Sequence, residues 1–269
     1  MLKQRVLTAL VLVPIALWGF FYLDGGAFAI FVGAVVAIGA WEWARLVGLE
    51  DSSSRLTYAG ICALLILLLW NMPSIARLVV LFGVVWWGFA WFLVLGFPDS
   101  SKFWQCNTTK YIIGLLILLP AWQGLVLIKS VDLHGNWIIF SIMLFVWAAD
   151  IGAYFAGRTW GKDKLAPKVS PGKSWQGFWG GMAAAVFIGI VIYFKSSFFD
   201  GKLLLSLICL VILVAFSVLG DLTESMFKRQ AGIKDSSNLL PGHGGVLDRI
   251  DSLTAAIPVA VLLLWVLGN

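Results

Sequence analysis

Residues 203–221 read LLLSLICLVILVAFSVLGD, an apolar run that carries no charge until Asp221. A helix rises 1.5 Å per residue, so roughly 20 apolar residues cross about 30 Å of membrane hydrocarbon. Similar runs recur along the chain, without the polar–apolar alternation of a membrane barrel. The runs lie at 6–23, 27–46, 56–71, 75–97, 111–128, 137–157, 176–194, 203–221 and 252–268. The sequence therefore predicts an all-α, polytopic integral membrane protein with about nine transmembrane helices.

The composition supports this fold class. Of the 269 residues, 61% are hydrophobic and 12% are charged, about half the charged share of a soluble domain. A globular domain of this size cannot bury so much apolar surface, which excludes a soluble enzyme and a disordered chain. The three cysteines are isolated and form no CxxC pair, so neither a disulfide framework nor a cysteine zinc site is expected.

The basic residues predict the orientation. If the N-terminus is cytoplasmic and the helices alternate, most Lys and Arg residues fall on the cytoplasmic side, as the positive-inside rule requires. The cytoplasmic set is Lys3, Arg5, Arg45, Arg55, Lys102, Lys110, Arg158, Lys162, Lys164, Lys168, Lys173, Lys228, Arg229, Lys234 and Arg249. The opposite set is Arg77, Lys129, Lys195 and Lys202.

The chain is expected to form a single membrane domain over 1–269. Residues 1–136 are interpreted as variable spans joined by short loops, and residues 137–269 as the catalytic part. The second part contains two long cytoplasmic loops, 158–175 and 222–251, rich in Gly, Ser and charged residues. Connections in helical bundles usually have 2–8 residues, so loops of this length often carry function.

The first polar segment begins at Asp150, at the end of an apolar stretch. A carboxylate at that depth is costly unless it is paired or hydrated, which favours a functional role over a side chain reaching the headgroups. Downstream, Ser170-Pro171-Gly172-Lys173-Ser174 resembles the end of a P-loop, but Pro167 stands where a P-loop needs glycine. Two interpretations stay open: a phosphate contact through Lys173 and Ser174, or a basic loop on lipid headgroups.

The second polar segment combines acids, bases and glycines. If the helix continues past Asp221, then Asp221, Glu224 and Ser225 share one face, and Asp248 and Asp251 are also three residues apart. Such oxygen ligands suit Mg²⁺, which typically takes one or two carboxylates plus substrate phosphates and water. The nearby bases, which a polyanion would require, are Lys228, Arg229, Lys234 and Arg249.

Glycine-rich sequence surrounds His243, and Gly242, Gly244 and Gly245 would let backbone approach a ligand closely. A single histidine is a poor zinc site. We favour structural or substrate hydrogen bonding by His243 over acid–base chemistry and over metal binding.

The segment 225–251 resembles the signature of the phosphatidate cytidylyltransferases, also called CDP-diacylglycerol synthases. It reads Ser225-x-Phe227-Lys228-Arg229-x4-Lys234-Asp235-x-Ser237-x2-Leu240-Pro241-x-His243-Gly244-Gly245-Val246-x-Asp248-Arg249-Ile250-Asp251, with no departure from the pattern. The region from Asp150 to Ser174 looks like a second region of that family. One departure is Gln176, where glutamate is expected.

The resemblance implies an enzyme that joins CTP and phosphatidate to give CDP-diacylglycerol and pyrophosphate, with Mg²⁺. It implies a homodimer in the bacterial inner (cytoplasmic) membrane, in contact with membrane lipid and with no nucleic-acid partner. Whether a second, monovalent ion assists is left open. The alternative, an ion or solute transporter, would place its polar site midway through the spans and would commonly show a sequence repeat.

The resemblance also implies roles for individual residues. The expected catalytic residues are Asp221, Lys228, Arg229, Lys234, Asp235, Asp248, Arg249 and Asp251. The expected substrate-binding residues are Asp150, Arg158, Ser170, Lys173, Ser174, Ser225, His243, Gly244 and Gly245. The expected metal ligands are Asp221, Asp248 and Asp251.

Overall fold

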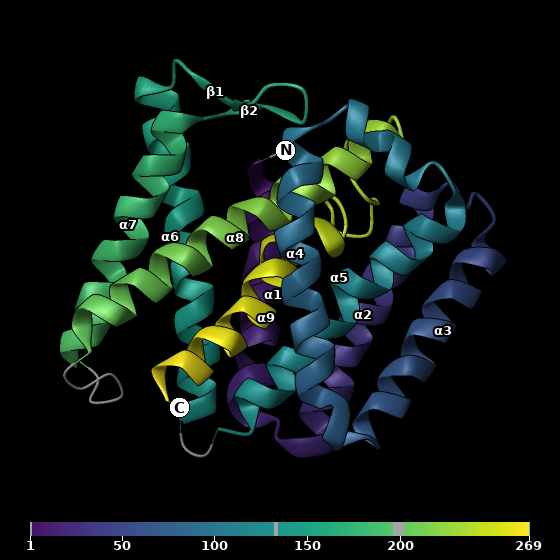
Figure 1. Cartoon of the computed structure of the whole chain (residues 1–269), viewed down its shortest axis with the longest axis horizontal. Helices are drawn as coiled ribbons and strands as arrows, with labels where there is room; N and C mark the ends of the chain where they lie inside the picture. Colours follow the sequence, from purple (N-terminus) through teal and green to yellow (C-terminus); the bar gives the residue numbers. More distant parts are fainter. Residues whose placement is uncertain (1, 132–133, 196–201, 269) are drawn as a thin grey trace.

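The computed structural model describes residues 2–131, 134–195 and 202–268, and the fold is helical (Figure 1). The long helices are α1 (Leu2–Tyr22), α2 (Gly25–Val47), α3 (Ser52–Trp70), α4 (Ala76–Leu95), α5 (Asn107–Lys129), α6 (Gly135–Trp160), α7 (Trp175–Lys195), α8 (Leu203–Gln230) and α9 (Leu247–Leu267). Two short 3-10 helices, η1 (Pro73–Ile75) and η2 (Asp99–Trp104), lie beside α4.

In the part of the chain that the structure describes, eight helices are long and apolar enough to cross a membrane. They are α2 to α9, with η1 continuing into α4. The remaining expected span, 6–23, is also helical, but its apolar part, Leu7–Tyr22, falls short of the same criterion. The predicted all-α, multi-pass membrane class is thus confirmed: eight of the nine expected spans meet the criterion among the described residues, and the first stays a prediction.

The expected cytoplasmic loop 158–175 contains a β-hairpin that the sequence did not predict. Strand β1 (Lys164–Ala166) pairs antiparallel with β2 (Ser170–Ser174), and Lys164 lies opposite Ser174. In Figure 1 the hairpin extends from the upper ends of α6 and α7 towards α4. It thereby carries Lys173 over the helix bundle.

The second expected loop, 222–251, is shorter than its polarity indicated. Helix α8 continues to Gln230 and α9 begins at Leu247, which leaves 231–246 as the connection. The charged residues in the last turns of α8 remain helical because they find partners inside the protein. The helix therefore ends about nine residues after the apolar run does.

Two packing arrangements hold the elements around the polar residues. Helices α6 and α7 approach closely through glycines, and a side chain at Gly152 would collide with Ala184 and the Gly180 backbone. On the other side, the Phe227 ring of α8 packs against Trp43 of α2 and Trp104 of η2, with ring centroids 4.9 and 5.2 Å apart. The polar end of α8 is therefore packed against the N-terminal part of the chain.

Candidate active site

A buried ion-pair cluster centres on Lys228 of α8. Its Nζ donates to Asp248 Oδ1 at 2.6 Å and lies 3.3 Å from Glu224 Oε1, one turn earlier on the same helix. The side chains of Lys228 and Asp248 are only 10% and 5% exposed. A buried charge needs such partners, because removal from water costs several kcal/mol per ion.

Both carboxylate oxygens of Asp248, in the first turn of α9, accept hydrogen bonds. While Oδ1 accepts from Lys228, Oδ2 accepts from Ser236 N at 2.9 Å, Ser236 Oγ at 3.0 Å and Gly245 N at 2.7 Å. Protein donors therefore surround this carboxylate, and it ties the connection 231–246 to α8 and α9.

A second ion pair joins the hairpin to α8. Lys173 Nζ lies 2.5 Å from Asp221 Oδ2, and Ser225 Oγ donates to Asp221 Oδ1 at 3.2 Å. The paired side chains are about a quarter exposed, at 27% and 28%. Lys173 also lines a cavity of about 200 Å³ together with Asp150 and Ser174. The structure thus brings both predicted polar segments to one place.

Two further acids face each other across α8 and α9. The carboxyl groups of Glu224 and Asp251 lie within hydrogen-bonding reach, and Asp251 also interacts electrostatically with Asp221. Asp251 Oδ1 accepts from Ser252 N at 2.7 Å. Apart from the ion pair of Oε1 with Lys228, neither oxygen of Glu224 has a donor group in hydrogen-bonding geometry among the described residues. The helical spacing put Glu224 on this face, but the family signature gave it no role.

The other predicted bases lie outside the buried cluster. Arg229 is exposed, and its Nε donates to the carbonyl of Val169 in the hairpin at 3.2 Å. Arg158 donates to the Tyr154 hydroxyl at 3.1 Å. Lys234, Asp235 and Arg249 are exposed. These side chains surround the site without contributing to its core.

Among the predicted substrate-binding residues, Ser174 has a structural contact. It is buried, and its Oγ accepts from Gly177 N at 3.1 Å, as an N-cap serine does at the start of a helix. Gly244 has φ +82°, a conformation that other residues rarely adopt, and a side chain there would meet Asp248. His243 and Ser170 are partly buried nearby in the chain.

Sequence reasoning missed Glu42 of α2. Its carboxylate is fully buried and accepts hydrogen bonds from the connection 231–246 and from the start of α9. The signal was available, because Glu42 is the single acid within the apolar run 27–46, where a carboxylate is costly unless satisfied.

The departure at Gln176 has a local explanation. Its Nε2 donates to Asp163 Oδ2 at 2.7 Å, while its Oε1 accepts from the backbone N–H groups of Lys162 and Asp163 at 3.1 and 3.2 Å. A glutamate could accept from the same N–H groups but could not donate to Asp163. The amide therefore fastens the start of the hairpin to α7.

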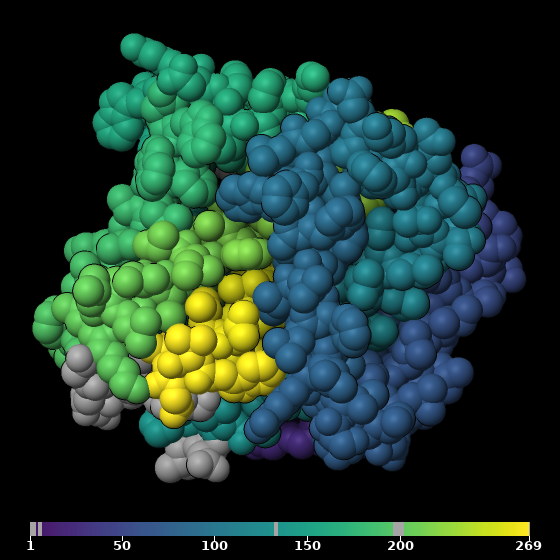
Figure 2. All heavy atoms as spheres, viewed as in Figure 1, coloured from purple at the N-terminus to yellow at the C-terminus, as the bar shows by residue number. Residues whose placement is uncertain are grey.

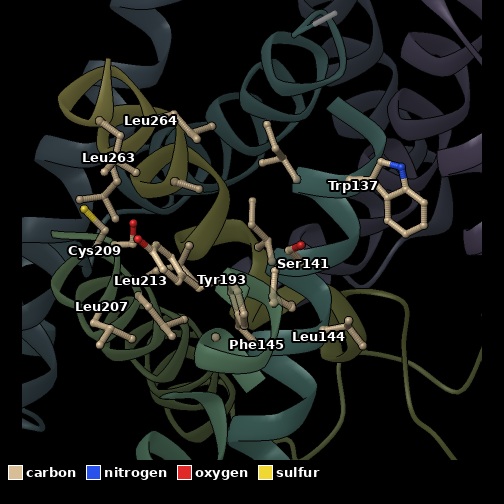
Figure 3. Close-up of a pocket in the computed structure, with 18 of the residues that line it drawn as sticks. Trp137, Ser141, Leu144, Phe145, Tyr193, Leu207, Cys209, Leu213, Leu263 and Leu264 are labelled. Carbon is tan, nitrogen blue, oxygen red and sulfur yellow. The ribbon is translucent and has the colours of Figure 1, made fainter. Parts of the chain in front are cut away.

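Two larger cavities are also lined mainly by apolar side chains. One of about 550 Å³ lies among α6, α7, α8 and α9, and Figure 3 shows side chains such as Phe145, Tyr193 and Leu213 around it. It contains none of the predicted site residues. Another of about 320 Å³ lies between α4, the hairpin and α8, where Figure 2 shows the surface hollowed beneath the hairpin. Leu165 and Phe178 line both this cavity and the cavity of about 200 Å³ that Lys173 lines.

The donor set fits a divalent ion only in part. Within the described ranges, no group of three or more His, Cys, Asp or Glu side chains is arranged to hold a metal. Both Asp248 and Asp221 have protein donors, but the Asp248 side chain is 5% exposed whereas that of Asp221 is 28% exposed and its partner Lys173 lines a cavity. Because Mg²⁺ commonly needs only one or two carboxylates when phosphates and water complete its shell, Asp221 fits that requirement best.

The fold and site define a polytopic helical membrane protein in which two ion pairs, Lys173–Asp221 and Lys228–Asp248, join a hairpin and two helices near a cavity that Asp150 and Lys173 line. Comparison with known proteins gives the family. A model described as the cytidylyltransferase family matches residues 3–267. The chain is 58% identical to a phosphatidate cytidylyltransferase of Pseudomonas aeruginosa, over 100% of this chain and 98% of the relative. The chain belongs to the cytidylyltransferase family.

More distant relatives agree. A phosphatidate cytidylyltransferase of Haemophilus influenzae is 43% identical, with 96% of each chain covered. One of Bacillus subtilis is 32% identical, over 98% of this chain and 97% of the relative. The resemblance first seen in residues 225–251 therefore extends over nearly the whole length, and it favours the enzyme over the transporter.

Proposed function

We propose that the protein is a phosphatidate cytidylyltransferase, which joins CTP and phosphatidate to give CDP-diacylglycerol and pyrophosphate. The observation that carries the proposal is the convergence of the two family-like segments: Lys173 of the hairpin pairs with Asp221 of α8 and lines a cavity together with Asp150. The names of the full-length relatives support the same reaction.

The chemistry needs positioning more than a strong base. An oxygen of the phosphatidate phosphate attacks the α-phosphorus of CTP, and the bond from that phosphorus to the bridging oxygen of pyrophosphate breaks. A phosphomonoester has its second pKa near about 6, so the nucleophile is largely ionised at neutral pH. The obstacle is mutual repulsion of two polyanions, which fixed positive charges reduce.

The basic residues differ in burial, and therefore in whether they can contact the substrate phosphates. Lys173 and Arg229 lie at the rim and are accessible to phosphate oxygens. Lys228 is buried and held by Asp248 and Glu224, which offset its charge, so it fixes the arrangement of these acids rather than contacting a phosphate. Ser225 orients Asp221 through its hydrogen bond.

We also propose Mg²⁺ as the metal, with Asp221 as its main protein ligand and Asp251 beside it. When bound, the ion would neutralise phosphate charge and favour departure of pyrophosphate. Asp248, expected from the sequence as a third ligand, is better suited to holding Lys228 and Ser236, because its side chain is 5% exposed and protein donors surround it, whereas that of Asp221 is 28% exposed.

The proposal places the protein in a bacterial inner membrane with its N-terminus in the cytoplasm. The distribution of basic residues supports that orientation. In Figure 1 the hairpin and the end of α8 lie towards the same end of the helices, where one compartment could supply CTP to both. The homodimer implied by the family resemblance stays a prediction.

The test uses purified protein in detergent with phosphatidate, Mg²⁺ and each of CTP, dCTP, UTP and ATP. Pyrophosphate release and the lipid product are followed with and without EDTA. We expect a CDP-lipid only with cytidine nucleotides and only when the metal is present. Folded protein that turns over none of the four nucleotides would contradict the proposed function, and unchanged turnover in EDTA would contradict the metal.

A further inference from the structure

Glu42 lies in α2, well separated in sequence from the two polar segments, yet its carboxylate is completely buried against the second of them. Oε1 accepts from Ser237 Oγ at 2.5 Å and Val246 N at 3.0 Å. Oε2 accepts from Ser236 Oγ at 3.1 Å and Leu247 N at 2.6 Å. The four donors all belong to one segment, 236–247.

Two of these contacts stabilise the start of α9. The first N–H groups of a helix have no partner within the helix, and a neighbouring side chain such as an N-cap Asp or Ser usually accepts from them. The residue before α9 is Val246, which has no such acceptor. Glu42 provides it from another helix, and its negative charge is favourable at a helix N-terminus.

The other two contacts link Glu42 to Asp248. The Ser236 hydroxyl lies 3.1 Å from Glu42 Oε2 and 3.0 Å from Asp248 Oδ2, and its single proton is shared between the two carboxylates, so one residue bridges them. Arg45, one turn after Glu42 on α2, donates from Nη1 to the Ser236 carbonyl at 3.1 Å. Helix α2 therefore holds Ser236 through both its side chain and its backbone.

Gly245 completes this contact. A side chain at Gly245 would collide with Ser236 Oγ and both oxygens of Glu42. The Gly245 N–H instead donates to Asp248 Oδ2 at 2.7 Å. The glycine thus allows Glu42, Ser236 and Asp248 to approach one another.

We propose that Glu42 is a positioning residue for the reaction. It fixes segment 236–247 so that Asp248 holds Lys228 at the site. Its effect on turnover rests on the proposed function, whereas its effect on the segment does not. Helix α2 belongs to the part that the sequence assigned to variable spans, so the site depends on both parts of the chain.

The test compares Glu42→Gln with Glu50→Gln in the full-length protein, since Glu50 is exposed and makes a matched control. Glutamine keeps the size but replaces one acceptor oxygen by a donor group. Amide hydrogen exchange is measured in the peptides covering 236–247, and kcat and KM for CTP are measured on the same samples.

We expect exchange in 236–247 to rise by about tenfold or more in Glu42→Gln, with other helices unchanged, because charge-assisted hydrogen bonds are lost. We expect kcat to fall by about tenfold or more while KM for CTP stays within about threefold. Glu50→Gln should match the unaltered protein in both measurements. Unchanged exchange would overturn the proposal, and so would faster exchange with full kcat.

A second variant keeps the test decisive if Glu42→Gln does not fold. Ser236→Ala removes the bridging hydroxyl but leaves every backbone donor in place, and it should also lower kcat with little change in KM. Full turnover in Ser236→Ala would then overturn the proposal. If the unaltered protein itself has no CTP turnover, the proposed function fails, and the exchange experiment still decides whether Glu42 holds the segment.

Discussion

Two lysine–aspartate pairs each have one member on α8. They are similar in length but differ in burial and in the elements they join. Lys228 and Asp248 are 2.6 Å apart and nearly inaccessible, and further donors surround the aspartate. Lys173 and Asp221 are 2.5 Å apart, about a quarter exposed, and beside a cavity. The first pair joins helices of the bundle, whereas the second joins a helix to a hairpin.

The difference in burial indicates that the Lys228–Asp248 pair has a structural role, whereas the Lys173–Asp221 pair is accessible to substrate. Breaking a buried pair leaves an uncompensated charge in a medium of low dielectric, so such a pair is held in place. A partly exposed pair costs little to open because water can replace either partner. Lys173 can therefore leave Asp221 for a substrate phosphate, while Lys228 stays with Asp248.

The largest effect is expected from Asp248→Asn. Its amide cannot accept all the hydrogen bonds that the two oxygens accept, and Lys228 loses its closest counter-charge. Turnover should be abolished, and the free energy of unfolding should fall by about 3 kcal/mol or more. Activity and denaturant unfolding in detergent check this, with the exposed Asp99→Asn as control. Activity like that of the unaltered protein would remove Asp248 from the site.

Asp221→Asn should have almost as little activity as Asp248→Asn, but the protein carrying it should be much more stable to unfolding. We expect turnover to fall by at least about a hundredfold, because the proposed metal ligand is lost. The free energy of unfolding should change by less than about 1 kcal/mol, because the pair is partly solvated. The same two measurements apply, and a loss of stability equal to that of Asp248→Asn would contradict the distinction between the pairs.

Lys173→Met should weaken substrate binding rather than the fold. Removing a rim charge should raise KM for CTP or phosphatidate by about tenfold, with a smaller effect at high salt, where the charge is screened. Lys168→Met is the control, since Lys168 is an exposed base in the same hairpin. Equal KM changes in the two variants would indicate a general effect of surface charge.

The smallest effect is expected from Gln176→Glu. The new carboxylate cannot donate to Asp163 and would repel it, which should loosen the hairpin that carries Lys173. We expect kcat/KM to fall about threefold and to recover when Asp163→Asn is added, because an amide then donates again. Steady-state kinetics of the two single variants and the double variant decide this. A double variant no better than Gln176→Glu would exclude that contact as the cause.

The sequence predicted most of what hydropathy and local spacing determine. Apolar runs such as 203–221 located eight spans, and the i, i+3 spacing of Asp221 and Glu224 located their shared face. It did not predict where α8 ends, because the charges that seemed to begin a loop are satisfied by Asp248 and Lys173. Those partners come from other elements and are invisible to local pattern.

Long-range contacts account for the rest. The pairing of Lys173 with Asp221 depends on a hairpin whose strands are only three and five residues long. The role of Glu42 depends on a segment almost 200 residues away, which no local spacing reveals. A buried acid in an apolar run could be recognised as unusual, but its partners could be found only in the fold.

The most direct test of the two-pair account is lysine reactivity. The full-length protein in detergent is treated briefly with an amine-acylating reagent, and modification of Lys173 and Lys228 is measured by mass spectrometry with and without CTP and Mg²⁺. We expect Lys173 to react in the free protein and to be protected by the nucleotide, whereas Lys228 should react in neither state. Equal reactivity of the two lysines, or a nucleotide that protects neither, would contradict it.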